Sequence, residues 1–483
     1  MPQHRRTLTI ILAALSLICF YRLRFNLVDQ SPPSWILGQD SEDVLNSTLD
    51  FAEIFVINLP SRRDRRDAMT MAGAVSNLNL TFLDGLRGDD SVTEFPSMGK
   101  SPDKERPGAK SYHSASAGAR GSWHSHMNAM QIIVAWDLGS ALVLEDDVDW
   151  DVRLKMQMGT FAKAARMWLD VEQEKHRRIS RLRNLETTGL QRLRRWLTEL
   201  VPSSFSEGTK KQGSKAESTM GPDSGSEVDY KRAVKEGLER DTITLPPNLH
   251  LNPGYGTHAK SPYGDDWDIL WLGHCGADLP TTRREPLPSR RNQFSSSLTI
   301  SIPDDATVPT PKHLKPHPFA LPDKLGEVYP PHTRIVHAVN GNVCSLAYAV
   351  SQTGARKLLR RFRRKGFVDQ WDLMLRDYCM GEYEDREEGG EEDESGEVGD
   401  EGEKNDGPPV CLTVQPPLIS HHYAGEEGAS VSDIRGQGGG LARGKKGTPY
   451  VRLSVQENLS RLVAGFPMHE LVDQLPDAGD PLW

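Results

Sequence analysis

The sequence predicts an α/β protein with a mostly parallel sheet and helices on both faces. Short apolar runs, each a candidate buried strand, alternate with helical patterns. A strand–helix–strand series recurs between residues 54 and 144, which is typical of a parallel sheet. Carboxylates follow one of these strands, at the edge where open α/β sheets bind ligands.

Composition indicates one folded unit with long insertions. The 483 residues include 32 prolines and 42 glycines, which are unevenly placed. We expect a folded domain at 51–465, with insertions near 155–262, 280–331, 381–408 and 425–447, and a C-terminal tail at 466–483. The net charge of −9 comes largely from the acidic run at 381–407 and indicates no nucleic-acid partner.

The N-terminus predicts a membrane anchor. Residues 1–6 are a basic, cytoplasmic tail, residues 7–24 an apolar signal-anchor helix, and residues 25–50 a stem. We prefer an uncleaved anchor to a signal peptide because no clear cleavage site follows. The expected protein is single-pass type II in the Golgi or endoplasmic reticulum membrane, with the folded domain in the lumen. Glycosylation sequons at Asn46, Asn79 and Asn458 agree with this placement.

Five cysteines occur in the chain, and one of them lies in the apolar N-terminal segment. The other four have no zinc-binding spacing, so an oxidising compartment would allow up to two disulfides. Cys379 and Cys411, which flank the acidic run, are the favoured pair. Four free thiols are the alternative.

The first half of the domain follows the predicted series. A strand at 54–59 leads into an arginine-rich helix start at 62–67, and a second strand at 80–83 follows. A helix at 118–137 then leads into an apolar run at 141–144, which we interpret as the central strand. A helical stretch extends from Trp150 to about residue 200, with a basic, amphipathic and solvated second half.

The second half contains fewer elements. Strands are predicted at 266–273 and 343–350, and a helix at 351–362 with Ser351 as its N-cap. Another helix opens within 366–372, and an extended segment at 410–420 ends at two histidines.

Three carboxylates, Glu145, Asp146 and Asp147, follow the central strand directly. Buried charges without partners are very costly, so these groups must reach solvent, a cation or a metal. Oxygen ligands suit Mg²⁺ or Mn²⁺, which usually lie between one or two carboxylates and substrate phosphates. A solvated acidic turn is the alternative.

Basic and polar groups near the same edge are candidates for a diphosphate site. Arg62, Arg65 and Arg66 follow the first strand, although a charged, solvated helix start explains these residues more simply when they are taken by themselves. Ser125 and His126 lie early in a helix, where the histidine either contacts a donor group or packs beside the sheet.

An ordered set of motifs resembles glycosyltransferase family 25, which includes lipooligosaccharide and collagen galactosyltransferases. The matching residues are Phe55-Val56-Ile57-Asn58-Leu59-Pro60 with Arg62 and Asp64-Arg65-Arg66, Ser125-His126, Leu142-Val143-Leu144-Glu145-Asp146-Asp147-Val148, Asp266-Trp267-Asp268-Ile269, Ala347-Tyr348, Gly354-Ala355 with Lys357-Leu358-Leu359, and Val368-Asp369. The long insertions and the pair His421-His422 resemble fungal-type members.

The resemblance implies a GT-A-type fold and metal-dependent, inverting transfer of a hexose, such as galactose, from a UDP-sugar to a glycan or glycoprotein. It also implies three sets of site residues, which bind the metal, bind the donor and act as the base. The metal, Mn²⁺ or Mg²⁺, would be held by Asp147 with either Glu145 or Asp146. His421 would complete the site, or else it is a surface histidine. The nucleotide-sugar donor would contact Asn58, Arg62, Arg65, Arg66, Ser125 and His126. The base that deprotonates the acceptor would be Asp369, or else Asp372, because Gln370 stands where collagen-type members carry a second acid.

Two rival interpretations remain at this point. A metal-dependent phosphoester hydrolase could use the same carboxylates, and it would need further His/Asp clusters at other strand ends. A lumenal glycan-binding protein could keep the fold without activity.

Overall fold

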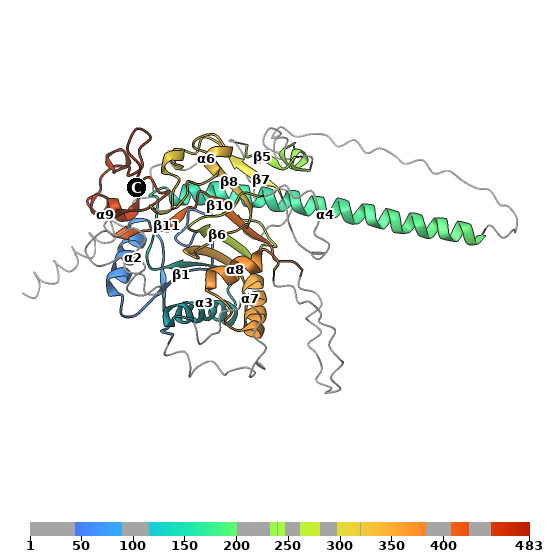
Figure 1. The fold of residues 1–483 in the computed structure, drawn as a ribbon, viewed down its shortest axis with the longest axis horizontal. Helices are drawn as coiled ribbons and strands as arrows, with labels where there is room; N and C mark the ends of the chain where they lie inside the picture. Colours follow the sequence, from blue (N-terminus) through green and yellow to red (C-terminus); the bar gives the residue numbers. More distant parts are fainter. Residues whose placement is uncertain are drawn as a thin grey trace, which may run out of the picture. The chain divides into compact units, whose positions relative to one another are not determined.

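The computed structural model describes residues 44–88, 115–199, 232–238, 240–246, 261–280, 297–318, 320–382, 407–424 and 446–483, with the backbone alone from 182 to 199 (Figure 1). The predicted anchor and residues 25–43 of the predicted stem lie outside these ranges. Within the ranges, no helix combines the length and the apolar character that a membrane crossing requires. The described residues belong to one compact unit, Asp43–Trp483, which extends beyond both ends of the domain predicted at 51–465.

A mixed sheet of 11 strands forms the centre of this part of the chain. Nine strands follow in the spatial order β2 (Thr81–Asp84), β1 (Glu53–Asn58), β3 (Ser140–Glu145), β9 (Ala347–Ser351), β6 (Ile269–Gly273), β10 (Cys411–Gln415), β8 (Arg334–Ala338), β7 (Thr299–Ile302) and β5 (Thr242–Thr244). Beside this row, β11 (Ile419–His421) pairs with β6 and with β4 (Val148–Trp150). All strands run in one direction except β9, β8 and β4, so the predicted α/β, mostly parallel sheet is confirmed.

Helices cover both faces of the sheet because the strands are apolar on both sides. In β1, Ile54 and Val56 belong to a core shared with α2 (Arg63–Val75), α4 (Leu154–Glu199) and α9 (Val455–Val463). Between them, Phe55 points into a second core with α3 (Ala117–Ala135), α7 (Gln352–Lys365) and α8 (Trp371–Cys379). Figure 1 shows these last three helices grouped on one side of the sheet.

Several boundaries differ slightly from expectation. Ser351 caps α7 as predicted, because its side chain accepts a hydrogen bond from the Gly354 amide. The helix expected to open within 366–372 begins at Trp371, after Gly366 adopts a left-handed φ of 67°. The strand predicted from residue 343 begins only at Ala347, because the four residues before it form a cross-linked segment instead.

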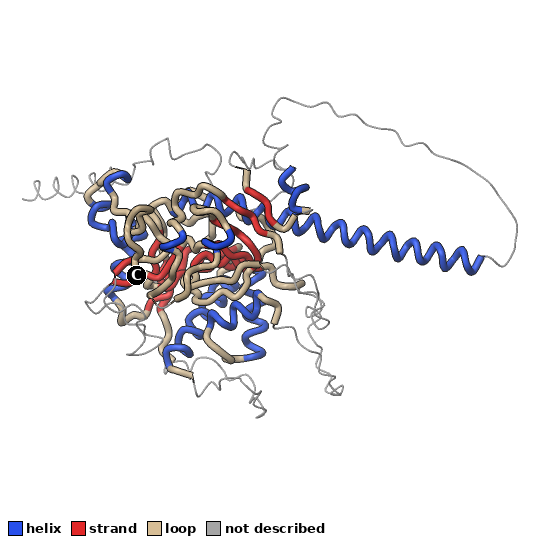
Figure 2. The backbone as a smooth tube through the Cα atoms, turned by 45° about the horizontal axis from the view of Figure 1, so that its top comes forward, coloured by secondary structure: helices blue, strands red, loops and turns tan. Residues whose placement is uncertain are grey.

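Three stretches that we interpreted as insertions or tail contribute to the folded core, which corrects the predicted boundaries. The first half of α4 buries Phe161 and Trp168 under the sheet, and β7 and β5 extend the sheet itself. Within 466–483, Leu475 is fully buried. Figure 2 shows α4 continuing well past the strands, where residues 176–181 are exposed, as the amphipathic pattern predicts.

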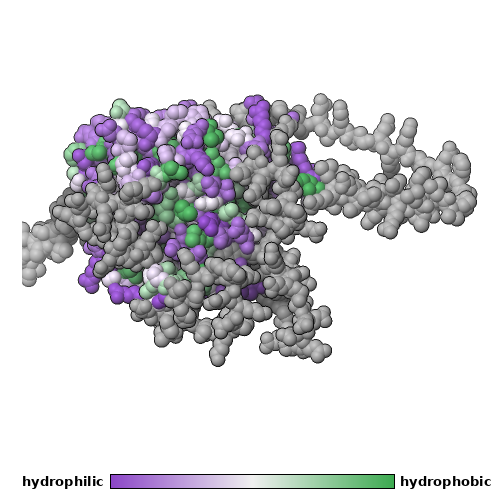
Figure 3. Space-filling view, viewed as in Figure 1, coloured by the Kyte–Doolittle hydropathy of each residue, from purple (hydrophilic) through white to green (hydrophobic). Residues whose placement is uncertain are grey.

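The surface and the cross-links complete this picture. On the face drawn in Figure 3, hydrophilic side chains dominate and hydrophobic ones occur in small groups, as on ordinary solvated domains. Two disulfides, Cys275–Cys344 and Cys379–Cys411, link the four cysteines. The favoured pair is confirmed, and the alternative of four free thiols is wrong.

Candidate active site

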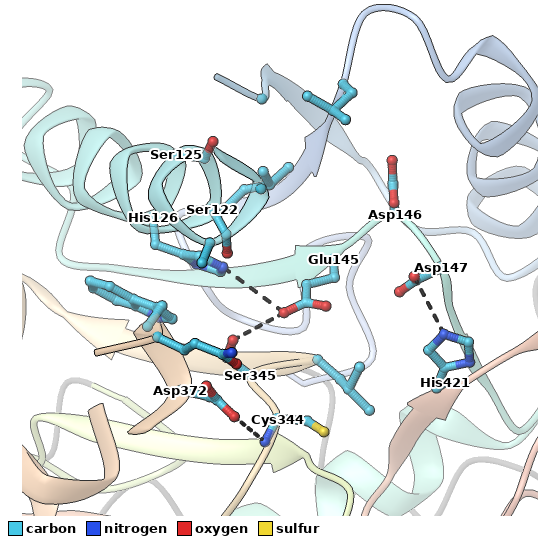
Figure 4. A pocket seen from close by; sticks show the side chains of 18 of the residues that line it. Ser122, Ser125, His126, Glu145, Asp146, Asp147, Cys344, Ser345, Asp372 and His421 are labelled. Carbon is cyan, nitrogen blue, oxygen red and sulfur yellow. Dashed lines mark hydrogen bonds and ion pairs between the residues drawn. The ribbon is translucent and has the colours of Figure 1, made fainter. Parts of the chain in front are cut away.

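A cavity of about 740 Å³ opens at the C-terminal ends of β1 and β3 (Figure 4). Segments 85–88, 343–346 and 370–373 form other parts of its wall. The cavity is lined by eight residues that the sequence predicted: Arg65, Ser125, His126, Glu145, Asp146, Asp147, Asp372 and His421. The other four predicted residues, Asn58, Arg62, Arg66 and Asp369, are not among its lining residues.

Arg65 joins two of the three carboxylates. The first turn of α2 brings its Nη1 atom to 2.6 Å from Asp146 Oδ1 and 2.9 Å from Asp147 Oδ2. Burial works against the charge of Arg65, yet Asp147 and Asp146 together raise its pKa. The carboxylate edge is therefore partly neutralised by the protein itself.

The two aspartates differ in their electrostatics. Burial, followed by the charge of Asp147, raises the pKa of Asp146 despite the contact with Arg65. Burial alone would also raise the pKa of Asp147, but His421 and Arg65 hold it well below its usual range. Asp147 is therefore the carboxylate that stays ionised most readily.

Asn58 supports the site from behind. Its Nδ2 atom donates to Asp146 Oδ2 at 2.7 Å and to the Arg62 carbonyl at 3.1 Å. Arg62 itself pairs with Asp64 at 2.8 Å. Arg66 is half exposed, 3.8 Å from Asp84 and stacked over Phe82. The solvated helix start thus describes Arg66, whereas the Arg62 side chain is mostly buried beside Asp64. Of the three arginines, Arg65 alone lines the cavity.

Glu145 ends β3 inside the cavity. Ser345 Oγ donates to its Oε1 atom at 3.0 Å, and His126 Nε2 lies 4.0 Å from the same atom. Burial, and after it the charge of Asp147, raises the pKa of Glu145 to about 8. Without a bound cation, this carboxyl group is mostly protonated at neutral pH.

His126 is a buried, neutral imidazole. It stacks on Trp371 with ring centroids 4.9 Å apart, and its Nδ1 atom lies 2.9 Å from the Tyr348 hydroxyl. Burial lowers its pKa to about 3, so it brings no positive charge to a phosphate at neutral pH. Ser125 has a local role, since it accepts from the Leu86 amide at 2.8 Å and donates to the Gly121 carbonyl.

Of the two candidate bases, the structure brings Asp372 to the cavity. It lies in the first turn of α8, and its Oδ2 atom accepts the Cys344 amide at 2.8 Å. Asp369 precedes the helix and accepts the Gln370 amide instead. The second choice from the sequence therefore fits the cavity better than the first.

Asp147 and His421 are the residues that best fit a divalent metal. Asp147 Oδ2 lies 3.4 Å from His421 Nε2. A dashed line marks this contact in Figure 4. Asp147 Oδ1 is buried and lacks a hydrogen-bond partner among the described residues. The described residues contain no group of three or more His, Cys, Asp or Glu side chains positioned to hold a metal ion. Two ligands fit an ion whose other positions are filled by diphosphate oxygens and water.

Three features of the site were missed. Ser345 and Trp371 reach Glu145 and His126 only through the fold, since Ser345 and Glu145 are 200 residues apart in the chain. The Cys275–Cys344 disulfide also lines the cavity. The adjacency of Cys344 and Ser345 was visible in the sequence, but nothing local marks it as part of a site.

Asp149, two residues after the last of the three carboxylates, has a structural role. It is fully buried and accepts hydrogen bonds from the hydroxyls of Thr448 and Ser454 and from the Gln456 amide. Its charge is therefore satisfied by the C-terminal segment rather than by a ligand. This contact explains why the chain after residue 446 packs against the sheet.

Comparison with known proteins agrees with this geometry. Curated proteins include no match to the chain. Residues 51–194 match the family described as glycosyltransferase family 25 (LPS biosynthesis protein), and this range contains β1, α2, α3 and the carboxylates after β3. Over these residues, the chain is similar to glycosyltransferase family 25.

Proposed function

We propose that this glycosyltransferase moves a hexose, with galactose as the first candidate, from a UDP-sugar to a hydroxyl group of a glycan or glycoprotein, with inversion. The observation that carries the proposal is the meeting of Asp147, His421 and Arg65 at one edge of a 740 Å³ cavity. A pair of metal ligands beside a fixed guanidinium suits the diphosphate of a nucleotide sugar.

When the bond between the sugar and the diphosphate breaks, negative charge develops on the oxygens of the departing diphosphate. A divalent ion held by Asp147 and His421, Mn²⁺ or Mg²⁺, would supply neutralisation of that charge. Arg65 fixes Asp146 and Asp147 before any ligand binds, so the site needs little reorganisation. Asn58 locks Asp146 from the other side.

Inversion by direct displacement needs a base that takes the proton of the acceptor hydroxyl. Asp372 is our assignment, because it lines the cavity and the Cys344 amide fixes one of its oxygens. Burial, with the charges of Asp147 and Asp372, raises the pKa of Glu145, which keeps its carboxyl group protonated and suited to hydrogen-bond donation. Asp372→Asn should therefore lower kcat more than donor affinity.

The compartment is part of the proposal. Two disulfides are typical of proteins that fold in an oxidising environment. They support a lumenal domain in the Golgi or endoplasmic reticulum, tethered by the apolar segment at 7–24 in type II orientation.

Calorimetric titration with UDP-sugars, with and without Mn²⁺, tests the binding step. We expect wild type to bind one donor and Asp147→Ala to weaken that binding at least tenfold. Asp64→Ala is the matched control, because Asp64 pairs with Arg62 outside the cavity. Wild type that binds no nucleotide sugar, or Asp147→Ala that binds as wild type does, would refute the proposed site.

A further inference from the structure

Three sequons occur in the chain, and the structure gives their asparagines very different surroundings. We propose that Asn46 and Asn79 carry N-linked glycans, that Asn458 does not, and that both glycans lie at the sheet edge opposite the cavity. This inference depends on passage through the secretory lumen and is independent of transferase activity.

Asn46 presents its amide nitrogen to solvent. Its side chain is exposed, and its Oδ1 atom accepts the amides of Thr48 and Asp50, each at 2.9 Å. The Thr48 hydroxyl, which completes the sequon, lies 3.2 Å from the same oxygen. This turn occupies the carbonyl oxygen of the side chain and leaves Nδ2 accessible for modification.

Asn79 lies beside the first sequon. Its side chain is exposed, and its backbone amide donates to the Ser47 carbonyl at 2.8 Å. Lys155 joins the same two segments, because its Nζ atom donates to the carbonyls of Leu45 and Asn77 at 2.9 and 3.0 Å. The two acceptor sites thus share one ordered surface.

The hydrogen bonds of Asn458 exclude it as a site of glycosylation. It is fully buried, and its Nδ2 atom donates to the carbonyls of Ser454 and Val472 at 2.9 and 3.0 Å. Its Oδ1 atom accepts the Val472 amide at 2.7 Å. A glycan would replace one of the two Nδ2 hydrogens and would need space in a filled interior. The folded protein therefore requires this asparagine unmodified, as a link between α9 and the following segment.

Strand direction separates the glycans from the cavity. The two sequon segments precede β1 and β2, which run parallel, so they lie at the N-terminal edge of these strands. The cavity lies at the C-terminal edge. We therefore expect the glycans to leave donor and acceptor access unchanged.

The modification needs a lipid-linked diphosphate oligosaccharide as the co-reactant. The asparagine Nδ2 forms a bond to the first sugar carbon and loses one proton. The bond from that carbon to the phosphate oxygen breaks, and the lipid diphosphate leaves.

The test is site-resolved mass spectrometry of the full chain from a eukaryotic host. An amidase that releases N-glycans in ¹⁸O water converts each occupied asparagine to labelled aspartate. Tryptic peptides 25–62, 67–87 and 453–461 each carry one sequon. We expect label in the first two peptides and an unmodified asparagine in the third.

Variants make the assignment falsifiable. Asn46→Gln and Asn79→Gln should each remove one glycan from the intact mass, and the double variant should remove both. Ser460→Ala destroys the third sequon without touching Asn458, so it should leave the glycan number unchanged. Label at Asn458, a loss of mass with Ser460→Ala, or an unlabelled Asn46 or Asn79 would overturn the proposal.

Discussion

The two disulfides offer a matched pair of perturbations. Cys275–Cys344 closes a loop with a sequence separation of 69, and Cys379–Cys411 closes one of 32. Chain entropy then gives about 4.4 and about 3.7 kcal/mol of stability, respectively. The double serine variants of the two pairs should therefore lose similar stability, within about 1 kcal/mol of each other.

Their effects on activity should differ. Both Cys275 and Cys344 line the cavity, whereas neither Cys379 nor Cys411 does. The Cys344 amide holds Asp372, and the next residue, Ser345, holds Glu145. Loss of the first disulfide should free this segment and lower kcat at least tenfold. Loss of the second should leave kcat within about twofold of wild type for the folded fraction.

Calorimetric unfolding gives the stability of each variant, and steady-state transfer at a temperature where both are folded gives kcat. Thiol titration of the denatured chains verifies which cysteines remain paired. Equal losses of kcat in the two double variants would refute the reasoning, because stability alone would then explain them. Full activity of Cys275→Ser/Cys344→Ser would refute it as well.

Two further predictions concern stability. Arg65→Met leaves two buried carboxylates without their cation and should lower the free energy of unfolding by about 3 kcal/mol in urea titrations, whereas the half-exposed Arg66→Met should change it little. Burial lowers the pKa of His274 and of His337 to about 4. The unfolded chain therefore binds more protons between pH 6.5 and 4, so stability should fall as the pH is lowered through this window, by up to about 3 kcal/mol per histidine. A free energy of unfolding that is unchanged between pH 7 and 5 would contradict this.

The first half of the fold follows from local sequence, because its signals are contiguous. The apolar run before Glu145 and the arginines after β1 indicate where the two strands end. They also indicate which charged groups meet at that edge of the sheet. By contrast, β7 is a four-residue strand between proline-rich stretches, too short to show a period. Its place in the sheet depends on pairing with β8, which lies more than thirty residues later.

The site was predictable to the same extent. The metal-ligand candidates adjoin a strand, so their clustering follows from the sheet edge. The choice between Asp369 and Asp372 depends on where α8 begins and on the Cys344 amide, and no sequence period encodes either. The sequon at Asn458 likewise indicates an exposed asparagine from sequence alone, whereas in the structure this side chain is fully buried.

The central claim is that the cavity binds a nucleotide sugar and catalyses the transfer of its hexose, and that this reaction requires Asp147. The most direct measurement is the release of UDP from a UDP-hexose by the purified protein with Mn²⁺ and an acceptor glycan. The account predicts multiple turnovers for wild type, at least a hundredfold loss for Asp147→Asn, and wild-type rates for Asp64→Ala. Wild type that releases no UDP from any UDP-hexose, or Asp147→Asn that turns over at the wild-type rate, would contradict it.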